Sequence, residues 1–149
     1  MSKEYVLVHN IGNINHPNYV TQEKIIVSSY IRCDGIYLSV YENKGLLKGK
    51  DVILYVIGDL VGKDNSFDLQ NVPKLERFCT QDQIDELVSE GAKLGWHTWS
   101  HRNLTTLTDE EIKRELEPPF ETEFLACPYE QVDDRVRNIA KSMGFKYIV

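Results

Sequence analysis

The sequence of 149 residues lacks several features that define large classes of proteins. No stretch reaches the roughly 18 consecutive apolar residues of a membrane-spanning helix, so no membrane span is expected. The net charge is −6 and the basic residues form no stripe along the chain, which argues against nucleic acid as a partner. The cysteines number only three, Cys33, Cys79 and Cys127, at wide spacing. Such a set does not form a disulfide framework and is typical of a reducing compartment.

The first residues lack the apolar core and the small-residue cleavage site of a secretory signal, because the apolar run there covers only residues 6–8. We therefore expect a cytoplasmic protein. No internal repeat, low-complexity tract or linker divides the chain, and its 42% hydrophobic and 27% charged residues are typical of soluble globular proteins. The sequence predicts a single domain over residues 1–149.

Short apolar segments alternate with segments of helical periodicity along most of the chain. Strands are expected at residues 24–32, 51–57, 96–99, 123–127 and 145–149, and helices at residues 37–47, 80–95, 108–118 and 132–144. Two of these helices begin with a capping box, Thr80 with Gln83 and Thr108 with Glu111. Residues 58–79 are expected to form a long surface loop. The alternation favours an α/β fold in which helices pack outside a parallel sheet that is either open or closed into a barrel.

Histidine is scarce, with four residues in the chain, yet His97 and His101 lie only four positions apart. Imidazoles at this spacing are typical of half of a metal site, and zinc needs at least three protein ligands. Asp34 is the best candidate for the third ligand. The strand pattern before it ends at Asp34 and Gly35, which would deliver the carboxylate to the carboxyl end of a strand, where α/β folds have their sites.

Three short motifs resemble those of a known family. Cys33-Asp34-Gly35, His97-Thr98-Trp99-Ser100-His101 and Ala126-Cys127-Pro128-Tyr129 resemble, in order and spacing, the first three motifs of the polysaccharide deacetylases of carbohydrate esterase family 4, the NodB-homology domain. The likeness runs from about residue 24 to the C-terminus. It implies a small distorted (β/α) barrel, incomplete here because the last third of the usual domain has no counterpart. Open strand edges are usually covered, so we expect a homodimer or a higher oligomer.

The resemblance implies a metal-dependent hydrolase that removes N-acetyl groups from a glycan, in polysaccharide or cell-envelope biosynthesis. A divalent metal, usually zinc in the family, would be held by Asp34, His97 and His101, and its open position would polarise the acetyl carbonyl and activate water. The backbone N–H of Tyr129 would donate to the oxyanion, as the residue after the proline does in the family. The residues expected to contact the N-acetylated carbohydrate substrate are Trp99, Pro128 and Tyr129.

The chain departs from the family pattern at the residues of acid–base catalysis. Cys33 stands where the family has the Asp that acts as general base, Ala126 stands where an Arg orients that base, and no histidine follows His101 to act as general acid. An Arg without its carboxylate would be a buried unpaired charge, so the two changes are physically consistent with each other. Cys33 is the candidate catalytic base, as a thiolate, or a direct metal ligand, and Cys127 is a second thiol that would face the same centre.

Two alternatives stay open. In a shifted register Asp34 is the base and Gly35 takes the place of the metal ligand, which leaves the metal with two protein ligands. In the other alternative the domain is catalytically degenerate and binds a glycan or a protein partner without turnover. His9 and His16 lie in a segment with no motif match, and either would replace the missing acid only if it reached the site.

Overall fold

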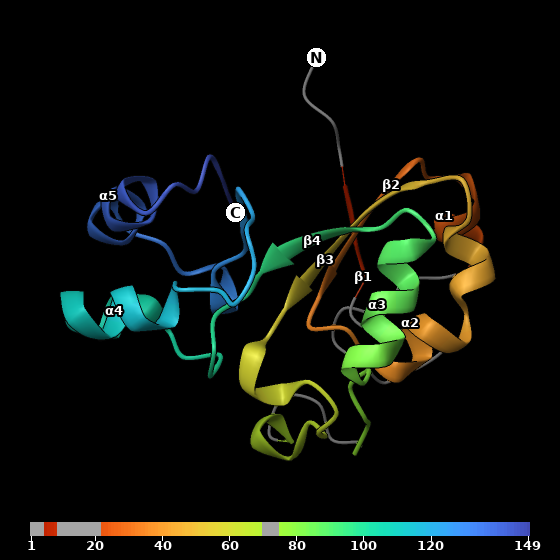
Figure 1. The fold of residues 1–149 in the computed structure, drawn as a ribbon, viewed down its shortest axis with the longest axis horizontal. Helices are drawn as coiled ribbons and strands as arrows, with labels where there is room; N and C mark the ends of the chain where they lie inside the picture. The colour runs from red at the N-terminus through yellow and green to blue at the C-terminus, as the bar shows by residue number, and fades with distance from the viewer. Residues whose placement is uncertain (1–4, 9–21, 70–74) are drawn as a thin grey trace.

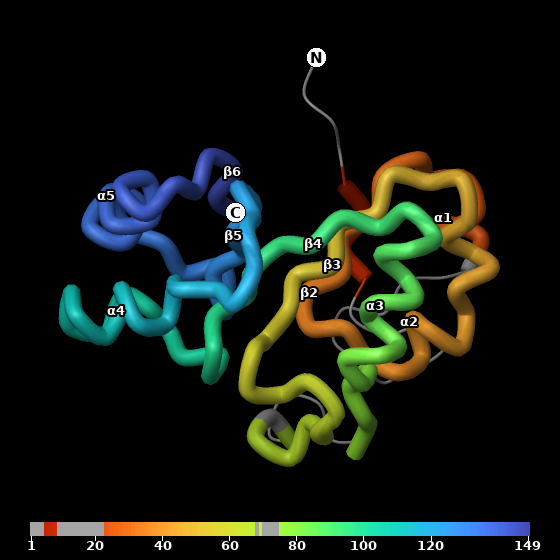
Figure 2. The backbone as a smooth tube through the Cα atoms, viewed as in Figure 1, coloured from red at the N-terminus to blue at the C-terminus, as the bar shows by residue number. Residues whose placement is uncertain are grey.

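The structure is a computed structural model that describes residues 5–8, 22–69 and 75–149. The described residues form a single sheet of six parallel strands whose spatial order is their order in the sequence. The strands are β1 (Val6–Val8), β2 (Tyr30–Asp34), β3 (Asp51–Val56), β4 (Lys93–Trp96), β5 (Phe124–Leu125) and β6 (Tyr147–Ile148). The sheet curls into a half-barrel (Figures 1 and 2). This confirms the predicted α/β fold with an incomplete barrel.

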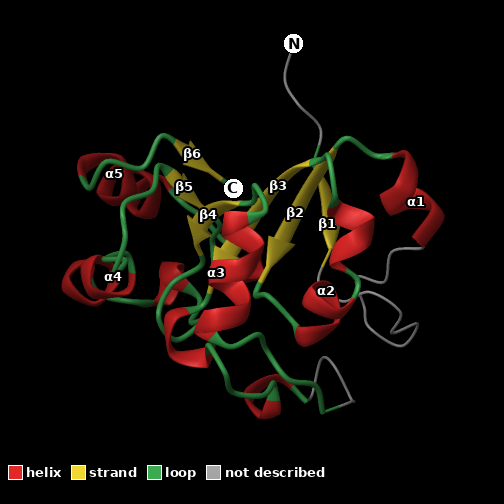
Figure 3. Ribbon diagram, turned by 45° about the vertical axis from the view of Figure 1, so that its right-hand side comes forward, coloured by secondary structure: helices red, strands yellow, loops and turns green. Residues whose placement is uncertain are grey.

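Helices connect the strands and lie around the outside of the curled sheet, with α1 and α2 flanking its first strands and α4 and α5 its last ones (Figure 3). The α-helices are α1 (Gln22–Val27), α2 (Leu38–Glu42), α3 (Gln81–Ser89), α4 (Asp109–Glu115) and α5 (Asp134–Ser142). Short 3-10 turns are η1 (Lys44–Leu47), η2 (Gly58–Leu60), η3 (Ser66–Asp68), η4 (Leu104–Thr106) and η5 (Pro128–Glu130). Among the described residues, no helix is long and apolar enough to span a membrane.

The two faces of the sheet have different surroundings, because side chains alternate along each strand. Ile31 and Cys33 of β2 belong to the main core, which contains the apolar side chains of the helices. Buried members of this cluster from the other elements are Leu54, Trp96, Leu125, Ile84, Ile112 and Val136. Arg32 and Asp34, at the alternate positions of β2, lie on the inner face with the small cluster of Ile53, Tyr55 and Ala126.

Both predicted capping boxes are confirmed. The Thr80 hydroxyl accepts from the Gln83 backbone N–H at 3.2 Å, and the Gln83 side chain accepts from the Thr80 N–H at 2.9 Å. The same reciprocal pair of bonds joins Thr108 and Glu111 at the start of α4. Each box satisfies two of the backbone N–H groups that a helix leaves unpaired at its first turn, which is why the sequence located these two helix starts correctly.

Three predicted boundaries are wrong. Residues 22–27 form α1 rather than the first half of a strand, since Ile25 is buried whereas Ile26 and Val27 are exposed, and β2 begins only at residue 30. Helix α3 ends at Ser89 instead of reaching residue 95, because the chain turns at Gly91 with a φ of +114° that suits glycine. Residues 93–96 then form β4, so the strand expected at residues 96–99 lies three residues earlier.

Residues 58–79 contain no long regular element in their described part. The turns η2 and η3 interrupt the segment, and two isolated antiparallel bridges, Tyr37 with Phe78 and Asp64 with Arg77, attach its return to the rest of the domain. The predicted long loop with short turns is therefore confirmed for residues 58–69 and 75–79, but it does not lie on the surface throughout, because Asn65, Phe78 and Cys79 are buried.

Candidate functional site

The predicted site residues other than the thiols gather at the carboxyl ends of the strands, where a parallel sheet usually has its site. The register pairs Asp34 of β2 with Tyr55 of β3, and Val56 of β3 with Trp96 of β4. The His97 backbone N–H donates to the Val56 carbonyl at 2.8 Å and continues this ladder by one residue. Asp34 and His97 thus come from separate strands to the same edge of the half-barrel.

His97 is held in one tautomer by a backbone contact. Its ring is 3% exposed, and its Nδ1 lies 2.7 Å from the carbonyl oxygen of Ala126. A carbonyl can only accept, so Nδ1 donates and Nε2 carries the lone pair. Burial has the largest effect on the pKa of His97 and lowers it, although the negative charge of Asp34 acts in the opposite direction. The ring is therefore neutral at pH 7 and is able to bind a metal or accept a proton.

The loop from His97 to His101 is fixed by its own polar side chains. The His101 N–H donates to the Thr98 hydroxyl at 3.0 Å, and both residues have a positive φ, 58° for His101 and 68° for Thr98. Ser100 donates through its backbone N–H and its hydroxyl to the carboxylate of Glu115, a residue of α4 that is only 6% exposed. These bonds bring the two imidazoles together, with ring centroids 4.8 Å apart.

Tyr129 lies on the other side of His101. Its ring centroid is 4.8 Å from that of His101, its side chain is half exposed, and its φ of 60° places it in the left-handed region. Pro128 is buried beside it at the start of η5. The third motif therefore reaches the histidine pair, as the sequence predicted, and Tyr129 presents the exposed ring of the group.

Asp34 is engaged by a residue that the sequence analysis did not single out. The Arg32 guanidinium donates through Nε to Asp34 Oδ1 at 2.8 Å and through Nη2 to Oδ2 at 2.5 Å. Both side chains are largely buried, with exposed fractions of 14% for Arg32 and 5% for Asp34, and the guanidinium also lies 5.5 Å from the centroid of the Tyr55 ring. The pair with Asp34 offsets burial and raises the pKa of Arg32, which stays charged.

The predicted ligand set fits a divalent metal only in part. His97 has a neutral ring with its Nε2 lone pair available, and His101 lies against it, as two imidazole ligands would. Asp34 differs from a dedicated metal ligand, because each of its oxygens accepts a hydrogen bond from the positively charged Arg32. Within the described part of the chain, no group of three or more His, Cys, Asp or Glu side chains is placed to hold a metal ion. In this arrangement Asp34 is paired with Arg32, while the two histidines lie against each other.

The thiols lie away from this group. Cys33 is fully buried in the core on the helix side of the sheet, and burial raises the pKa of its thiol far above the ordinary range. Cys127 belongs to the same core, and burial raises its pKa to about 11. A side chain that faces the helices and stays protonated is badly placed to act as base or ligand on the inner face. The structure therefore argues against both expected roles of Cys33 and against the expected role of Cys127.

The two tryptophans of the second motif have different surroundings. Trp96 is fully buried and donates through Nε1 to the Glu115 carbonyl, whereas Trp99 is partly exposed and donates to the Glu117 carbonyl. Trp99 also borders a cavity of about 320 Å³ that is lined by Asp59, Trp99, Arg102, Glu111, Arg114 and Glu115. His9 and His16 lie outside the described residues.

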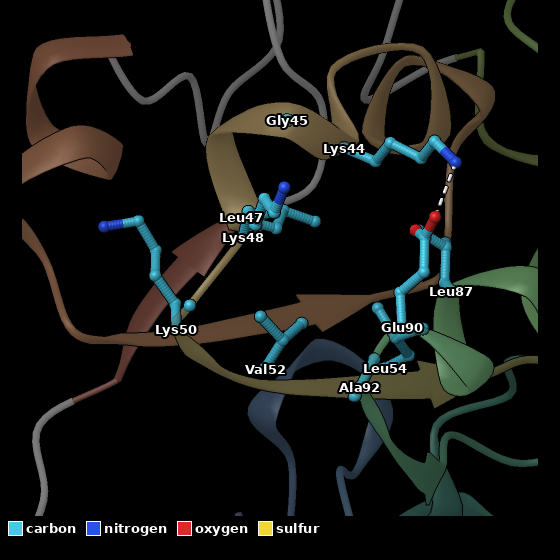
Figure 4. A pocket seen from close by; sticks show the side chains of 12 residues that line it. Lys44, Gly45, Leu47, Lys48, Lys50, Val52, Leu54, Leu87, Glu90 and Ala92 are labelled. Carbon is cyan, nitrogen blue, oxygen red and sulfur yellow. Dashed lines mark hydrogen bonds and ion pairs between the residues drawn. The ribbon is translucent and has the colours of Figure 1, made fainter.

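A larger cavity, of about 530 Å³, opens at the opposite end of the strands. Its lining includes the first residues of β3, the segment around η1 and the end of α3 (Figure 4). Lys44 at its rim forms ion pairs with Glu86 and Glu90. Because Lys50, Val52 and Ala92 lie at the amino ends of their strands, this cavity is separate from the histidine pair.

Arg32 and Glu115 are the functional candidates that sequence reasoning missed. Arg32 lies two residues before Asp34 on a strand, so the two-residue period already put both side chains on one face. That signal was available. Glu115 carries no such signal, since a single acidic residue within an amphipathic helix is ordinarily solvated.

Comparison with known proteins assigns the family. A family model described as polysaccharide deacetylase matches residues 47–148. The chain belongs to the polysaccharide deacetylase family. The match includes the second and third motifs, while Arg32, Cys33 and Asp34 precede it.

Curated relatives of this polysaccharide deacetylase-family chain match over short segments. Chitin deacetylase 1 of Cryptococcus neoformans is 40% identical over an alignment that covers 40% of this chain and 14% of the relative. Chitin deacetylase 1 of Saccharomyces cerevisiae is 30% identical over an alignment that covers 46% of this chain and 26% of the relative. The chain thus aligns with about a quarter or less of the length of these relatives.

Solved structures share the fold over nearly the whole chain. IcaB from Ammonifex degensii has a TM-score of 0.72 at 16% identity, with 97% of this chain and 82% of that chain covered. The deacetylase PplD of Streptococcus pyogenes has a TM-score of 0.69 at 14% identity, with 95% and 80% covered. At these identities the likeness establishes the architecture.

Proposed function

We propose that this chain hydrolyses the N-acetyl groups of a carbohydrate, as a deacetylase acting in polysaccharide or cell-envelope biosynthesis. The observation that carries the proposal is the meeting of His97, His101 and Tyr129 at the carboxyl ends of the strands, with ring centroids 4.8 Å apart, in a member of the polysaccharide deacetylase family. Chitin deacetylases among the relatives support an N-acetylated glycan as the substrate class.

The residues of the site have distinct tasks in this proposal. His97 supplies a neutral imidazole whose Nε2 is available, and the Thr98 and Glu115 contacts hold His101 beside it. The backbone N–H of Tyr129 stabilises the oxyanion that forms when water adds to the acetamide carbonyl. Its exposed ring, together with Trp99 and Pro128, contacts the sugar. The water loses a proton as it adds, the C–N bond then breaks, acetate leaves, and the amine of the sugar takes up the proton that the water lost.

Asp34 keeps the two roles that the sequence left open. Asp34 is either the general base, as in the shifted alignment of the first motif, or a ligand to a divalent metal. We propose zinc as that metal. Metal binding would supply a Lewis acid for the acetyl carbonyl. It would require Asp34 to turn from Arg32, so we derive no step through the metal.

Acetate release tests the proposal. The purified chain is incubated with N-acetylated chitooligosaccharide and, separately, with peptidoglycan fragments, with and without added zinc, and acetate is measured enzymatically. We expect release that falls at least 100-fold in His97→Ala and is unchanged in Lys141→Ala, which removes an exposed charge from α5. No release from either substrate class under any condition would contradict the enzyme.

A second candidate function is glycan binding without turnover. It is favoured by the Arg32–Asp34 ion pair and by the burial of Cys33, which leave the position of the family's general base without a free carboxylate or an accessible thiolate. Calorimetric titration with the same oligosaccharides separates the two functions. Binding that Tyr129→Ala weakens, without acetate release, would favour this candidate.

The cellular location is part of the proposal. The three cysteines are all buried and free of disulfides, which fits a reducing compartment, and we therefore propose a cytoplasmic protein. Fractionation of cells that express the natural gene at its own level would test this location.

A further inference from the structure

The ion pair of Arg32 and Asp34 occupies the position where the family resemblance placed a metal ligand. Both carboxylate oxygens are used, one by Nε at 2.8 Å and the other by Nη2 at 2.5 Å. This two-point contact is the strongest arrangement that Arg and a carboxylate form, and burial protects it from solvent screening.

Arg32 also brings its own positive charge directly against Asp34, the carboxylate that the resemblance names as a metal ligand. A guanidinium cannot lose its proton near neutral pH, in contrast to a lysine. A divalent cation entering between Asp34 and His97 would therefore meet a fixed charge of the same sign and a carboxylate already engaged.

We propose that Arg32 competes with a divalent metal for Asp34, so that metal occupancy of this site requires the ion pair to open. The inference rests on the proposed function, since it concerns control of the same site. In the closed state, the guanidinium satisfies the buried carboxylate in place of the metal, and the histidines alone hold any metal weakly. In the open state, Asp34 completes the set of three ligands.

The test measures zinc affinity of the full chain by competition with a chromophoric chelator. Arg32→Met removes the charge and keeps an unbranched side chain that can pack on Tyr55. We expect Arg32→Met to bind zinc at least tenfold more tightly than the unmodified chain, and the gain to vanish in the double variant Arg32→Met with Asp34→Asn. Arg135→Met is the matched control, because it removes an exposed arginine of α5 that pairs with Asp109 of α4, and it should leave zinc affinity unchanged.

A folded Arg32→Met variant that binds zinc equally or more weakly would overturn the proposal, because Arg32 would then position Asp34 for the metal or have no influence on it. Arg32→Gln serves as a second neutral variant if Arg32→Met does not melt cooperatively. In the unmodified chain, the Arg32 Nε–H proton signal provides an independent test by NMR. Release of Arg32 should move it towards the position of a free guanidinium as zinc saturates, and an unchanged signal at saturation would also overturn the proposal.

The zinc measurement and the acetate assay can each reject one proposal without rejecting the other. Tighter zinc binding in Arg32→Met with no acetate release from any variant would leave the competition standing and reject the deacetylase. If the unmodified chain releases acetate and Arg32→Met does not change zinc affinity, the deacetylase proposal stands and the competition is rejected.

Discussion

His97 is a buried titratable residue whose protonation opposes folding. Burial lowers its pKa below the ordinary value near 6.5, so the unfolded chain binds a proton at a higher pH than the folded chain does. Stability from this residue is fully present above pH 6.5 and is lost as the pH falls towards the lowered pKa, at about 1.4 kcal/mol for each unit of pH within that window.

Urea unfolding at pH 7.5 and pH 5.0 checks this expectation. His97→Gln, which cannot titrate, should show a smaller fall in the free energy of unfolding between the two pH values than the unmodified chain shows. An equal fall in both proteins would mean that other groups account for the acid sensitivity.

Cys33 provides a second prediction at the residue scale. The thiol is inaccessible and its pKa is raised by burial, so both access and thiolate formation limit its reactivity. We expect iodoacetamide to label Cys33 only upon unfolding, at the same rate with and without zinc. Mass spectrometry after timed labelling measures this. Protection that depends on zinc would instead restore Cys33 as a ligand.

At the residue scale, the sequence predicted which residues lie at the site better than it predicted which way their side chains face. The motif spacing found His97, His101 and Tyr129, which the fold brings together as expected. The motif comparison assigned the catalytic base to Cys33, because Cys33 occupies the position of the base in the family. Side chains alternate along β2, however, and this alternation turns Cys33 towards the helices. The same alternation turns Arg32 towards Asp34, which only a reading of β2 as a strand with two faces would have indicated.

Among the elements, the turn η2 that follows β3 leaves no room for a side chain at Gly58. A Cβ there would lie 2.2 Å from Trp99 Cε3 and 2.6 Å from Trp96, and the Gly58 N–H donates to the Thr98 carbonyl at 3.0 Å. Gly58→Ala should therefore push Trp99 away and lower the free energy of unfolding by about 1–3 kcal/mol. Chemical denaturation measures the loss. Gly45→Ala, where a Cβ would meet nothing within 4 Å, is the matched control and should cost less than about 0.5 kcal/mol.

Helix α4 supports the histidine loop through Glu115. Removing this carboxylate in Glu115→Ala leaves the Ser100 N–H and hydroxyl without their acceptor, and we expect a loss of about 2 kcal/mol in the free energy of unfolding. Catalytic or binding activity should fall as well, because His101 adjoins Ser100. Glu110→Gln, on the exposed side of the same helix, should change neither quantity. Retained stability and activity in Glu115→Ala would show that the loop holds its shape alone.

The helices and strands also show why the first and last residues of an element were harder to predict than whether the element is a helix or a strand. Capping boxes are local, so Thr80 and Thr108 marked helix starts without knowledge of the rest of the chain. Residues 24–27 look like a strand because they are rich in β-branched residues, yet the core accepts only Ile25 from that run and the segment forms a helix. The packing partner that decides this is distant in the sequence, and periodicity alone does not contain it.

At the scale of the whole molecule, the described sheet ends in two strands that are each paired on one side only, β1 and β6. An unpaired edge offers backbone donors and acceptors to another chain. Tyr147 of β6 is 55% exposed and stacks on Phe124 at 4.9 Å, so the edge also presents an apolar surface. A homodimer remains our prediction, and we expect β6 to contribute to its interface.

Light scattering after size exclusion, over a hundredfold range of concentration, tests the dimer. We expect a mass of twice 17.2 kDa for the unmodified chain and a shift towards 17.2 kDa in Tyr147→Lys, because a charge on the edge disfavours strand pairing between copies. Met143→Lys places the same charge at the exposed C-cap of α5, outside the strand, and should leave the mass unchanged. A mass of 17.2 kDa for the unmodified chain at every concentration would mean that the half-barrel is stable with both edges open, and its site would then belong to a single copy.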